Sequence, residues 1–163
     1  MAERIISLAG SLAVAKDQLD NQAVFDTLTN FWDVRLFTSI SRGVETLPPR
    51  LLPISFVALD IDNFKLINDT FGIPTGDEVL QVLSQTIREK SRPYDCIGRW
   101  AGDEFVLVLA GVIGADAEKV AERIIAGVRG TRIEVPNEPP LNVKISAGIA
   151  SVARISTSTK LKR

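Results

Sequence analysis

The apolar run over residues 54–59, which ends on Asp60 and Asp62, is the feature that most constrains how this chain folds. A short apolar run that follows a proline-rich segment, here residues 48–53, is typical of a strand buried in a sheet. The two aspartates stand where this strand leaves the core. The sheet is therefore expected to deliver carboxylates to its rim.

Helical and strand patterns alternate along the rest of the chain. Apolar residues at helical spacing, interrupted by a break from Gly72 to Gly76, predict helices over residues 64–71, 77–90 and 115–128. Strands are predicted over residues 96–100, 105–109 and 141–152, and a tight turn at 101–104 joins the first two. This order of elements is that of a split βαβ arrangement. We therefore predict an α+β fold with a ferredoxin-like antiparallel sheet and packed helices.

A further helix is predicted at the N-terminus, within residues 1–22. Its apolar residues recur at alternating spacings of three and four, which is the seam of a coiled coil; they are Ile5, Leu8, Leu12, Ala15 and Leu19. An amphipathic helix that packs on its own domain is the alternative reading. We expect residues 1–22 to form a linker or signalling helix and residues 23–163 to form one domain, with another helical stretch around residues 34–40.

Charge and residue usage exclude several classes of function. The chain has 19 basic and 20 acidic residues, and so lacks the positive excess of a dedicated nucleic-acid surface. It has no histidine and a single cysteine, Cys96, which excludes the usual zinc sites and an internal disulfide. No apolar run approaches the roughly 20 residues that cross a bilayer. We expect a cytoplasmic protein, or the cytoplasmic part of a membrane-anchored sensor.

Carboxylates from neighbouring strand ends are the candidate metal ligands. Asp60 and Asp62 end the first strand, and Asp103 lies in the hairpin turn of the strands beside it. Converging carboxylates with no histidine nearby suit a hard cation such as magnesium, or manganese in its place. Gly102 would let a phosphate ligand approach the backbone closely. The alternative is that Asp60 and Asp62 cap the following helix and that Asp103 only forms the turn.

Two long motifs resemble the signatures of the GGDEF diguanylate cyclases. Residues 59–72 read LDIDNFKLINDTFG and are followed by GDEVL at 76–80. Residues 99–105 read RWAGDEF, the motif that names the family, with alanine in place of the first glycine. The DTLT sequence at 26–29 is similar to the opening motif of the family, and residues 143–150 resemble its last core strand. The resemblance runs in matching order over about residues 25–152.

The resemblance implies a metal site and a proton acceptor. Asp60 and Asp103 would hold the magnesium ions, and the backbone carbonyl of Ile61 would complete the site. Asp103, or as a second choice Glu104, would take the proton from the attacking hydroxyl. The metal would neutralise charge on the triphosphate, so that the protein mainly positions the reacting groups.

The resemblance also implies a nucleotide site. Asn68 and Asp77 would read the edge of guanine, because a carboxylate accepts two hydrogen bonds from the adjacent N–H donors of guanine and not of adenine. Phe64 and Lys65 would face the phosphates, and Lys65 would stabilise the developing phosphoryl charge. The alternative for Lys65 is an ordinary solvated lysine on a helix.

The implied function is the joining of two GTP molecules into cyclic di-GMP by a homodimer in which each protomer holds one GTP. An upstream sensory domain is expected. Arg92 and Asp95 match the Arg-x-x-Asp product-inhibition site of the family, and an arginine fork with a carboxylate suits a guanine dinucleotide. A surface ion pair is the alternative for these two residues. The alternative function is a catalytically degenerate domain that senses GTP or cyclic di-GMP.

Three features depart from the family pattern. Ala101 adds a methyl group that would strain the loop if its position needs a positive φ. Ile73 replaces the histidine that usually follows Phe-Gly. After Val152 the terminal helix of the family, with its basic residues, is missing or diverged, and the polar residues 156–163 predict disorder.

Overall fold

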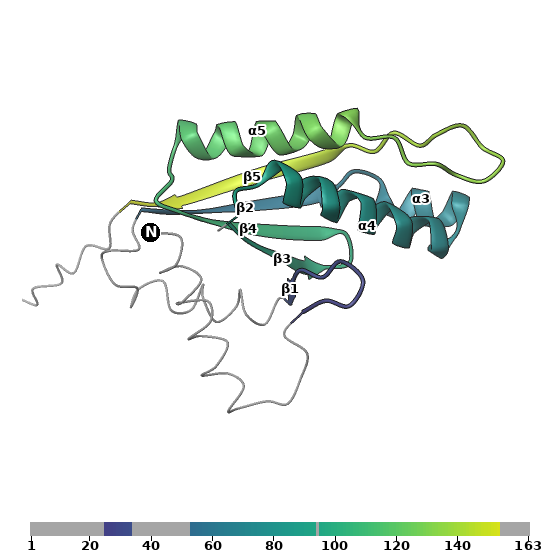
Figure 1. Ribbon diagram of the computed structural model, residues 1–163, viewed down its shortest axis with the longest axis horizontal. Helices are drawn as coiled ribbons and strands as arrows, with labels where there is room; N and C mark the ends of the chain where they lie inside the picture. The colour runs from purple at the N-terminus through teal and green to yellow at the C-terminus, as the bar shows by residue number, and fades with distance from the viewer. Residues whose placement is uncertain (1–24, 34–52, 94, 154–163) are drawn as a thin grey trace, which may run out of the picture.

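Strand β2 (Ile54–Ile61) lies inside a sheet, as its apolar sequence predicts (Figure 1). It pairs antiparallel with β4 (Glu104–Ala110) on one side and with β5 (Ile145–Val152) on the other. Strand β3 (Cys96–Ala101) pairs antiparallel with the far edge of β4, and the short strand β1 (Trp32–Asp33) runs parallel to β3. The resulting order β1-β3-β4-β2-β5 contains the predicted ferredoxin-like arrangement.

The computed structural model describes residues 25–33, 53–93 and 95–153. The predictions for residues 1–22, 34–40 and 156–163 lie outside the described residues. Within the described part of the chain, no helix combines the length and the apolar character needed to cross a membrane.

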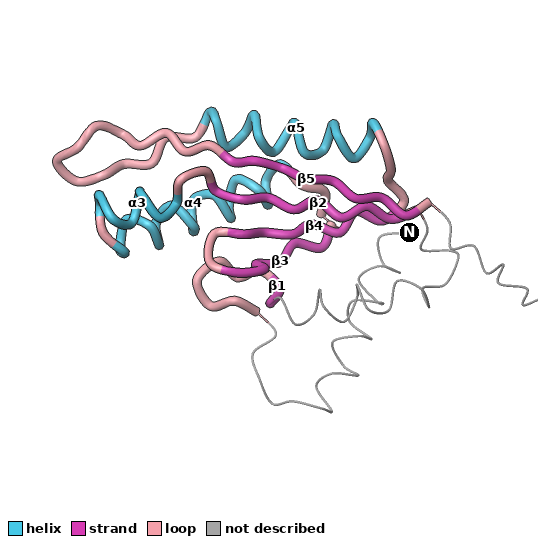
Figure 2. The backbone as a smooth tube through the Cα atoms, turned by 180° about the vertical axis from the view of Figure 1, so that it is seen from behind, coloured by secondary structure: helices cyan, strands magenta, loops and turns pink. Residues whose placement is uncertain are grey.

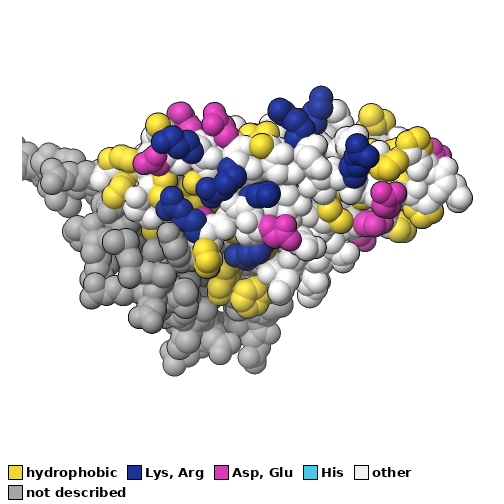
Figure 3. Space-filling view, turned by 45° about the horizontal axis from the view of Figure 1, so that its top comes forward, with side chains coloured by type: hydrophobic (Ala, Val, Ile, Leu, Met, Phe, Trp, Pro, Cys, Tyr) yellow, Lys and Arg dark blue, Asp and Glu magenta, His cyan; other side chains and the backbone are white. Residues whose placement is uncertain are grey.

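The helices of the described residues are α3 (Phe64–Phe71), α4 (Ile73–Lys90) and α5 (Ala115–Gly130). Helices α3 and α4 connect β2 to β3, and α5 connects β4 to β5. Figures 1 and 2 show α4 and α5 side by side over the same face of the sheet. A space-filling view over the helical layer shows basic and acidic side chains interspersed (Figure 3), which is typical of a solvated helical surface.

The core lies between the sheet and these helices. Val57, Leu59 and Ile61 alternate along β2 and are at most 2% exposed, so this face of the strand is fully covered. Burying one such side chain contributes about 1.5–3 kcal/mol. The side chains that meet them from β4, α4 and α5 include Phe105, Leu107, Leu109, Val79, Leu83, Ile87, Val120 and Ile124.

The predicted break between α3 and α4 is wrong in extent. Helix α4 begins at Ile73 and not at residue 77, because only Gly72, with a φ of 88°, leaves helical geometry. Pro74 is tolerated in the first turn, where an amide donor has no intrahelical partner. Gly76 lies inside the helix, so its role is in packing and not in breaking the chain.

One strand boundary and one short strand also differ from the prediction. Strand β5 begins at Ile145 and not at residue 141, since Leu141 instead pairs with Ile133 in an isolated bridge. Strand β1 was not predicted, because two residues are too short to produce an alternating pattern.

Candidate active site

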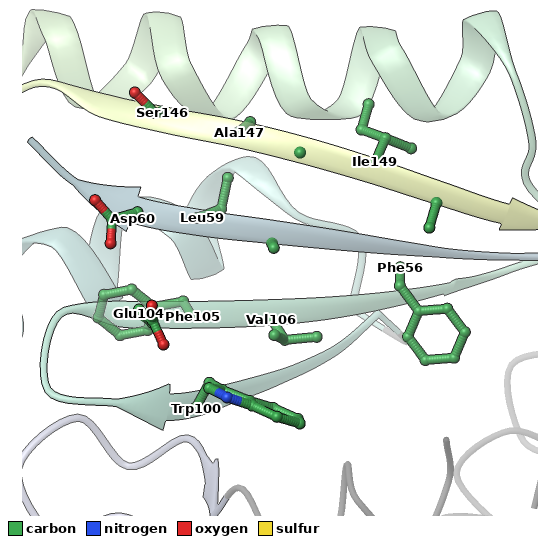
Figure 4. Close-up of a pocket in the computed structure, with 13 residues that line it drawn as sticks. Phe56, Leu59, Asp60, Trp100, Glu104, Phe105, Val106, Ser146, Ala147 and Ile149 are labelled. Atoms are coloured by element: carbon green, nitrogen blue, oxygen red, sulfur yellow. The ribbon is translucent and has the colours of Figure 1, made fainter. Parts of the chain in front are cut away.

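Strand pairing brings two carboxylates to one end of the sheet. Asp60, near the end of β2, lies opposite Glu104 at the start of β4. Their neighbours Leu59 and Phe105 are buried in the core, so the alternation of side chains turns Asp60 and Glu104 to the opposite face. Figure 4 shows both carboxylates on that side of the sheet. The predicted delivery of carboxylates to the rim is therefore seen in the structure.

Asp103 lies beside this pair, in the hairpin turn between β3 and β4. The Ile61 amide donates a hydrogen bond of 3.3 Å to the backbone carbonyl of Asp103, which ties the end of β2 to the turn. Gly102 has a φ of 22°, and a side chain at its position would meet nothing within 4 Å. The backbone of the turn is therefore accessible to a ligand.

The carboxylates at this rim repel one another. The pKa of Asp60 is raised above its usual value, first by partial desolvation of its carboxyl and then by the charges of Asp103 and Asp62. Asp62 itself accepts a hydrogen bond of 2.7 Å from the Ser146 hydroxyl, and its amide donates to the Lys144 carbonyl. A cation placed between Asp60 and Asp103 would relieve this repulsion.

The donor set fits a hard divalent cation only in part. Oxygen ligands without histidine or cysteine suit magnesium, which usually takes one or two carboxylates and completes its shell with water and substrate phosphates. Among the described residues, no group of three or more histidine, cysteine, aspartate or glutamate side chains is arranged to hold a metal ion. Two carboxylates with a nucleotide triphosphate would therefore suit this rim better than a site built from protein alone.

A second polar position lies between α3 and α4. The side-chain oxygen of Asn68 is buried and has no hydrogen-bond partner among the described residues. It lies against Gly76, and the ring of Phe64 is also close to that glycine. Asp77 is exposed in the next position of α4. A buried oxygen without a partner costs about 1–3 kcal/mol, so this position suits a ligand that donates a hydrogen bond.

Lys65 lies on the exposed surface of α3. Its Nζ donates a hydrogen bond of 3.0 Å to Asp69, and the two side chains are 88% and 60% exposed. An exposed pair of this kind contributes little to stability. Lys65 therefore loses little if it turns toward a phosphate.

A shallow cavity of about 730 Å³ lies on the face of the sheet opposite the helices. Asp60 and Glu104 line one end, and apolar side chains such as Phe56, Trp100 and Val106 line the rest (Figure 4). Lys65, Asn68 and Asp77 do not line this cavity. Of the predicted site residues, Asp60, Asp103 and Glu104 lie together at the rim, whereas Asn68 and Asp77 lie between α3 and α4.

The family profile described as "Diguanylate cyclase, GGDEF domain" matches residues 23–161, which is most of the chain. The chain belongs to the GGDEF diguanylate cyclase family. It is similar to the diguanylate cyclase DosC of Escherichia coli K12, with 38% identity over 126 residues that cover 77% of this chain and 27% of DosC. The chain thus spans about a quarter of the length of that relative.

Solved structures of GGDEF proteins have the same fold. The diguanylate cyclase SiaD of Pseudomonas aeruginosa, in complex with its activator SiaC, superposes with a TM-score of 0.74 at 29% identity, covering 95% of this chain and 58% of SiaD. The GGDEF domain of DgcB from Caulobacter crescentus, in complex with c-di-GMP, gives a TM-score of 0.72 at 26% identity. That match covers 82% of this chain and 78% of the DgcB domain.

Two departures from the GGDEF pattern have a structural explanation. Ala101 is the last residue of β3, and it is not among the described residues with positive φ, so its methyl group causes no backbone strain. The positive φ of the turn is at Gly102. Ile73 is the first residue of α4 and is 61% exposed, so the replacement changes the surface of the domain and not its core.

The Arg92 and Asp95 positions of this GGDEF domain lie between α4 and β3. Asp95 is only 5% exposed, and its carboxylate accepts a hydrogen bond of 2.8 Å from the Arg92 amide. Burial raises the pKa of Asp95, despite this hydrogen bond and the nearby charge of Arg92. Asp95 therefore closes its own loop and is not part of a surface ion pair. Its role in product inhibition stays a prediction.

Sequence reasoning missed one connection at the GGDEF turn. The sequence identifies Arg99 only as part of the motif, yet its guanidinium contacts both Gly102 and Asp26. The sequence likewise identifies Asp26 only as part of the opening motif. The spacing of three residues between Arg99 and the turn glycine was a local signal for their contact, but no local pattern indicated Asp26 as a second partner of Arg99.

Proposed function

We propose that this chain is a diguanylate cyclase that joins two GTP molecules into cyclic di-GMP and releases two molecules of pyrophosphate. The observation that carries the proposal is the meeting of Asp60 and Asp103 at one rim of a GGDEF fold. The similarity of the chain to the diguanylate cyclase DosC supports the same activity. In the reaction, the ribose 3′-hydroxyl of each GTP attacks the α-phosphate of the other.

Asp60 and Asp103 would hold magnesium, together with the Ile61 carbonyl. When bound, the ion would lower the pKa of the attacking hydroxyl and neutralise triphosphate charge. Asp103 would accept the hydroxyl proton, with Glu104 as the second candidate. Lys65 would leave Asp69 to stabilise charge on the phosphoryl oxygens. Gly102 would let the phosphates approach the backbone of the turn.

The guanine base would bind between α3 and α4. The partnerless oxygen of Asn68 supports this placement, because a guanine N–H would supply the missing donor. Asp77 would accept two further guanine N–H groups, and the ring of Phe64, which lies close to Gly76, would border the base. Guanine presents these N–H donors and adenine does not, so the acceptors of Asn68 and Asp77 favour GTP over ATP.

We further propose a homodimer with one GTP in each protomer, a cytoplasmic location, and a sensory domain or activating partner that controls the dimer. The complex of SiaD with its activator SiaC supports partner control in a related protein. The apolar seam formed by Ile5, Leu8, Leu12, Ala15 and Leu19 is the proposed dimer contact outside the described residues.

The test is incubation of the chain with GTP and magnesium chloride, followed by quantification of cyclic di-GMP and pyrophosphate. The rate should rise more steeply than linearly with protein concentration while dimers are scarce, because each product needs two half-sites. Binding of GTP or cyclic di-GMP without any product would favour the alternative, a sensory GGDEF domain without catalysis.

Replacing Asp77 by serine should reduce the preference for GTP over ATP by about tenfold to a hundredfold, since the bidentate acceptor for guanine is removed. The preference is measured by competition between the two nucleotides. Glu78→Ser, one residue further along α4, removes the same charge and is the matched control. An unchanged preference in Asp77→Ser would mean that Asp77 does not read the base.

Replacing Arg92 by alanine should raise the inhibition constant for cyclic di-GMP about tenfold or more without lowering the initial rate. The alanine variant keeps the backbone amide that Asp95 accepts from, so the loop should stay folded. A titration with cyclic di-GMP measures the effect, and Arg129→Ala on α5 removes an equal charge as a control. Equal inhibition of variant and parent would exclude Arg92 from an inhibitory site.

A further inference from the structure

Arg99 of β3 contacts two groups that are far apart in the sequence. Its Nε and Nη2 donate hydrogen bonds of 2.9 and 2.7 Å to the backbone carbonyl of Gly102. Its Nη1 donates to both carboxylate oxygens of Asp26, 73 residues away, at 3.1 and 3.2 Å. The guanidinium therefore joins the turn that carries Asp103 to the N-terminal end of the described domain.

The hairpin is irregular where Arg99 reaches across it. Arg99 pairs with Phe105 and Ala101 pairs with Glu104, so Trp100 is an extra residue on β3. A bulge of this kind interrupts the backbone ladder next to the turn. The two hydrogen bonds from Arg99 to the Gly102 carbonyl supply a constraint that the interrupted ladder lacks.

The Gly102 carbonyl belongs to the same peptide unit as the Asp103 amide. Because a peptide unit is planar, fixing its carbonyl oxygen also fixes the direction in which the chain enters Asp103. The Asp103 carbonyl on the other side of that residue accepts the hydrogen bond from the Ile61 amide. Both peptide units that flank Asp103 are therefore held by hydrogen bonds.

Asp26 holds the guanidinium from the other side. Its Oδ1 also accepts hydrogen bonds from the Thr29 amide at 2.9 Å and the Thr29 hydroxyl at 2.7 Å. Burial opposes ionisation of Asp26, but the hydrogen bonds from Thr29 and Arg99 outweigh it, and the pKa is lowered. The side chains of Asp26 and Arg99 are only 25% and 17% exposed, so solvent screens this pair less than a surface pair.

We propose that Arg99, oriented by Asp26, is a positioning residue that holds the Gly102–Asp103 peptide so that the Asp103 carboxylate stays directed at the rim beside Asp60. The proposal rests on the proposed function and adds a residue to its machinery. Arg99 acts through the Gly102 carbonyl. The guanine contacts at Asn68 and Asp77 lie away from this turn, so the loss of Arg99 should lower the turnover of bound GTP by a larger factor than it weakens the binding of GTP with magnesium.

The primary test uses the Arg99→Lys variant of the full chain. Lysine keeps the positive charge but has no planar fork to hold one carbonyl with two N–H groups. We expect kcat to fall about tenfold to a hundredfold, while the dissociation constant for a non-reactive GTP analogue with magnesium rises by a clearly smaller factor. Hydrogen exchange of the Ile61 amide, which donates to the Asp103 carbonyl of the turn, should become at least about tenfold faster when followed by NMR, since the turn is released.

A second variant tests the role of Asp26. Asp26→Asn keeps an oxygen that accepts from Thr29 but removes the charge that orients the guanidinium, so it should lower kcat in the same direction by a smaller factor. When Asp26→Asn is combined with Arg99→Lys, kcat should fall little further than in Arg99→Lys alone, because both changes release the same turn. Asp116→Asn is the matched control, since it breaks the ion pair with Lys119, 3.0 Å long, at the start of α5.

The outcomes separate this proposal from the proposed function. An unchanged kcat in Arg99→Lys overturns the positioning role of Arg99. An equal loss of GTP affinity and kcat, together with a lower melting temperature, also overturns it, because that result indicates a structural role only. If the parent chain forms no cyclic di-GMP, the proposed function fails and the exchange measurement decides. Faster exchange of the Ile61 amide without faster exchange in the core then supports the positioning role, whereas unchanged exchange of the Ile61 amide overturns it.

Discussion

The Asp103→Asn variant is expected to form cyclic di-GMP at least about a hundredfold more slowly than the parent while keeping its fold. The variant loses one of the two carboxylates proposed to hold magnesium and the proposed proton acceptor. Asparagine has nearly the same shape, favours turns, and keeps the backbone carbonyl that accepts from Ile61. The melting temperature should therefore stay within about 2 °C of that of the parent.

The same variant has a readout that does not depend on catalysis. The charge of Asp103 is one cause of the raised pKa of Asp60, so without metal the pKa of Asp60 should fall part of the way to its usual value. Desolvation and the charge of Asp62 remain. The control Asp116→Asn, at the start of α5, should leave the pKa and the rate unchanged. Normal turnover by folded Asp103→Asn would remove Asp103 from the active site.

The strands that carry the site were predictable because their signal is local. The apolar run of β2 and the tight turn between β3 and β4 place Asp60 and Asp103 at one rim once the strand order is known. The start of α4 was mispredicted because two glycines were given the same role. Gly72 has the positive φ that ends a helix, whereas Gly76 packs against a side chain of another helix, which no local pattern reveals.

The parts of the candidate site that the sequence could not supply are contacts between distant residues. The pairing of Arg99 with Asp26 joins residues 73 positions apart, and periodicity does not link them. The burial of Asp95 depends on how the loop after α4 packs, so the sequence pattern was equally compatible with an exposed ion pair. Motifs identified these residues as candidates, but only the fold assigned partners to Arg99 and Asp95.

Replacing Gly76 by alanine should separate that packing role from helix propensity. In an exposed helix interior this change stabilises by about 1 kcal/mol. Here the new Cβ would overlap the Asn68 side-chain oxygen, and would lie 2.9 Å from Asn68 Cγ and 3.3 Å from Phe64 Cζ. Overpacking typically costs about 1–3 kcal/mol, so the two effects offset each other in part. The free energy of unfolding should fall by no more than about 2 kcal/mol.

The effect of Gly76→Ala on nucleotide binding should be larger than its effect on stability. The Asn68 side chain must move away from the new methyl group, and it is the group proposed to accept a guanine N–H. Losing that hydrogen bond should weaken GTP binding about tenfold or more, measured by calorimetry with a non-reactive analogue and magnesium. Gly130→Ala is the matched control, because Gly130 is also helical and an added Cβ there would meet nothing within 4 Å. If Gly76→Ala is folded and binds the analogue as tightly as the parent and the control, Asn68 is not part of the guanine site, and its buried oxygen needs another explanation.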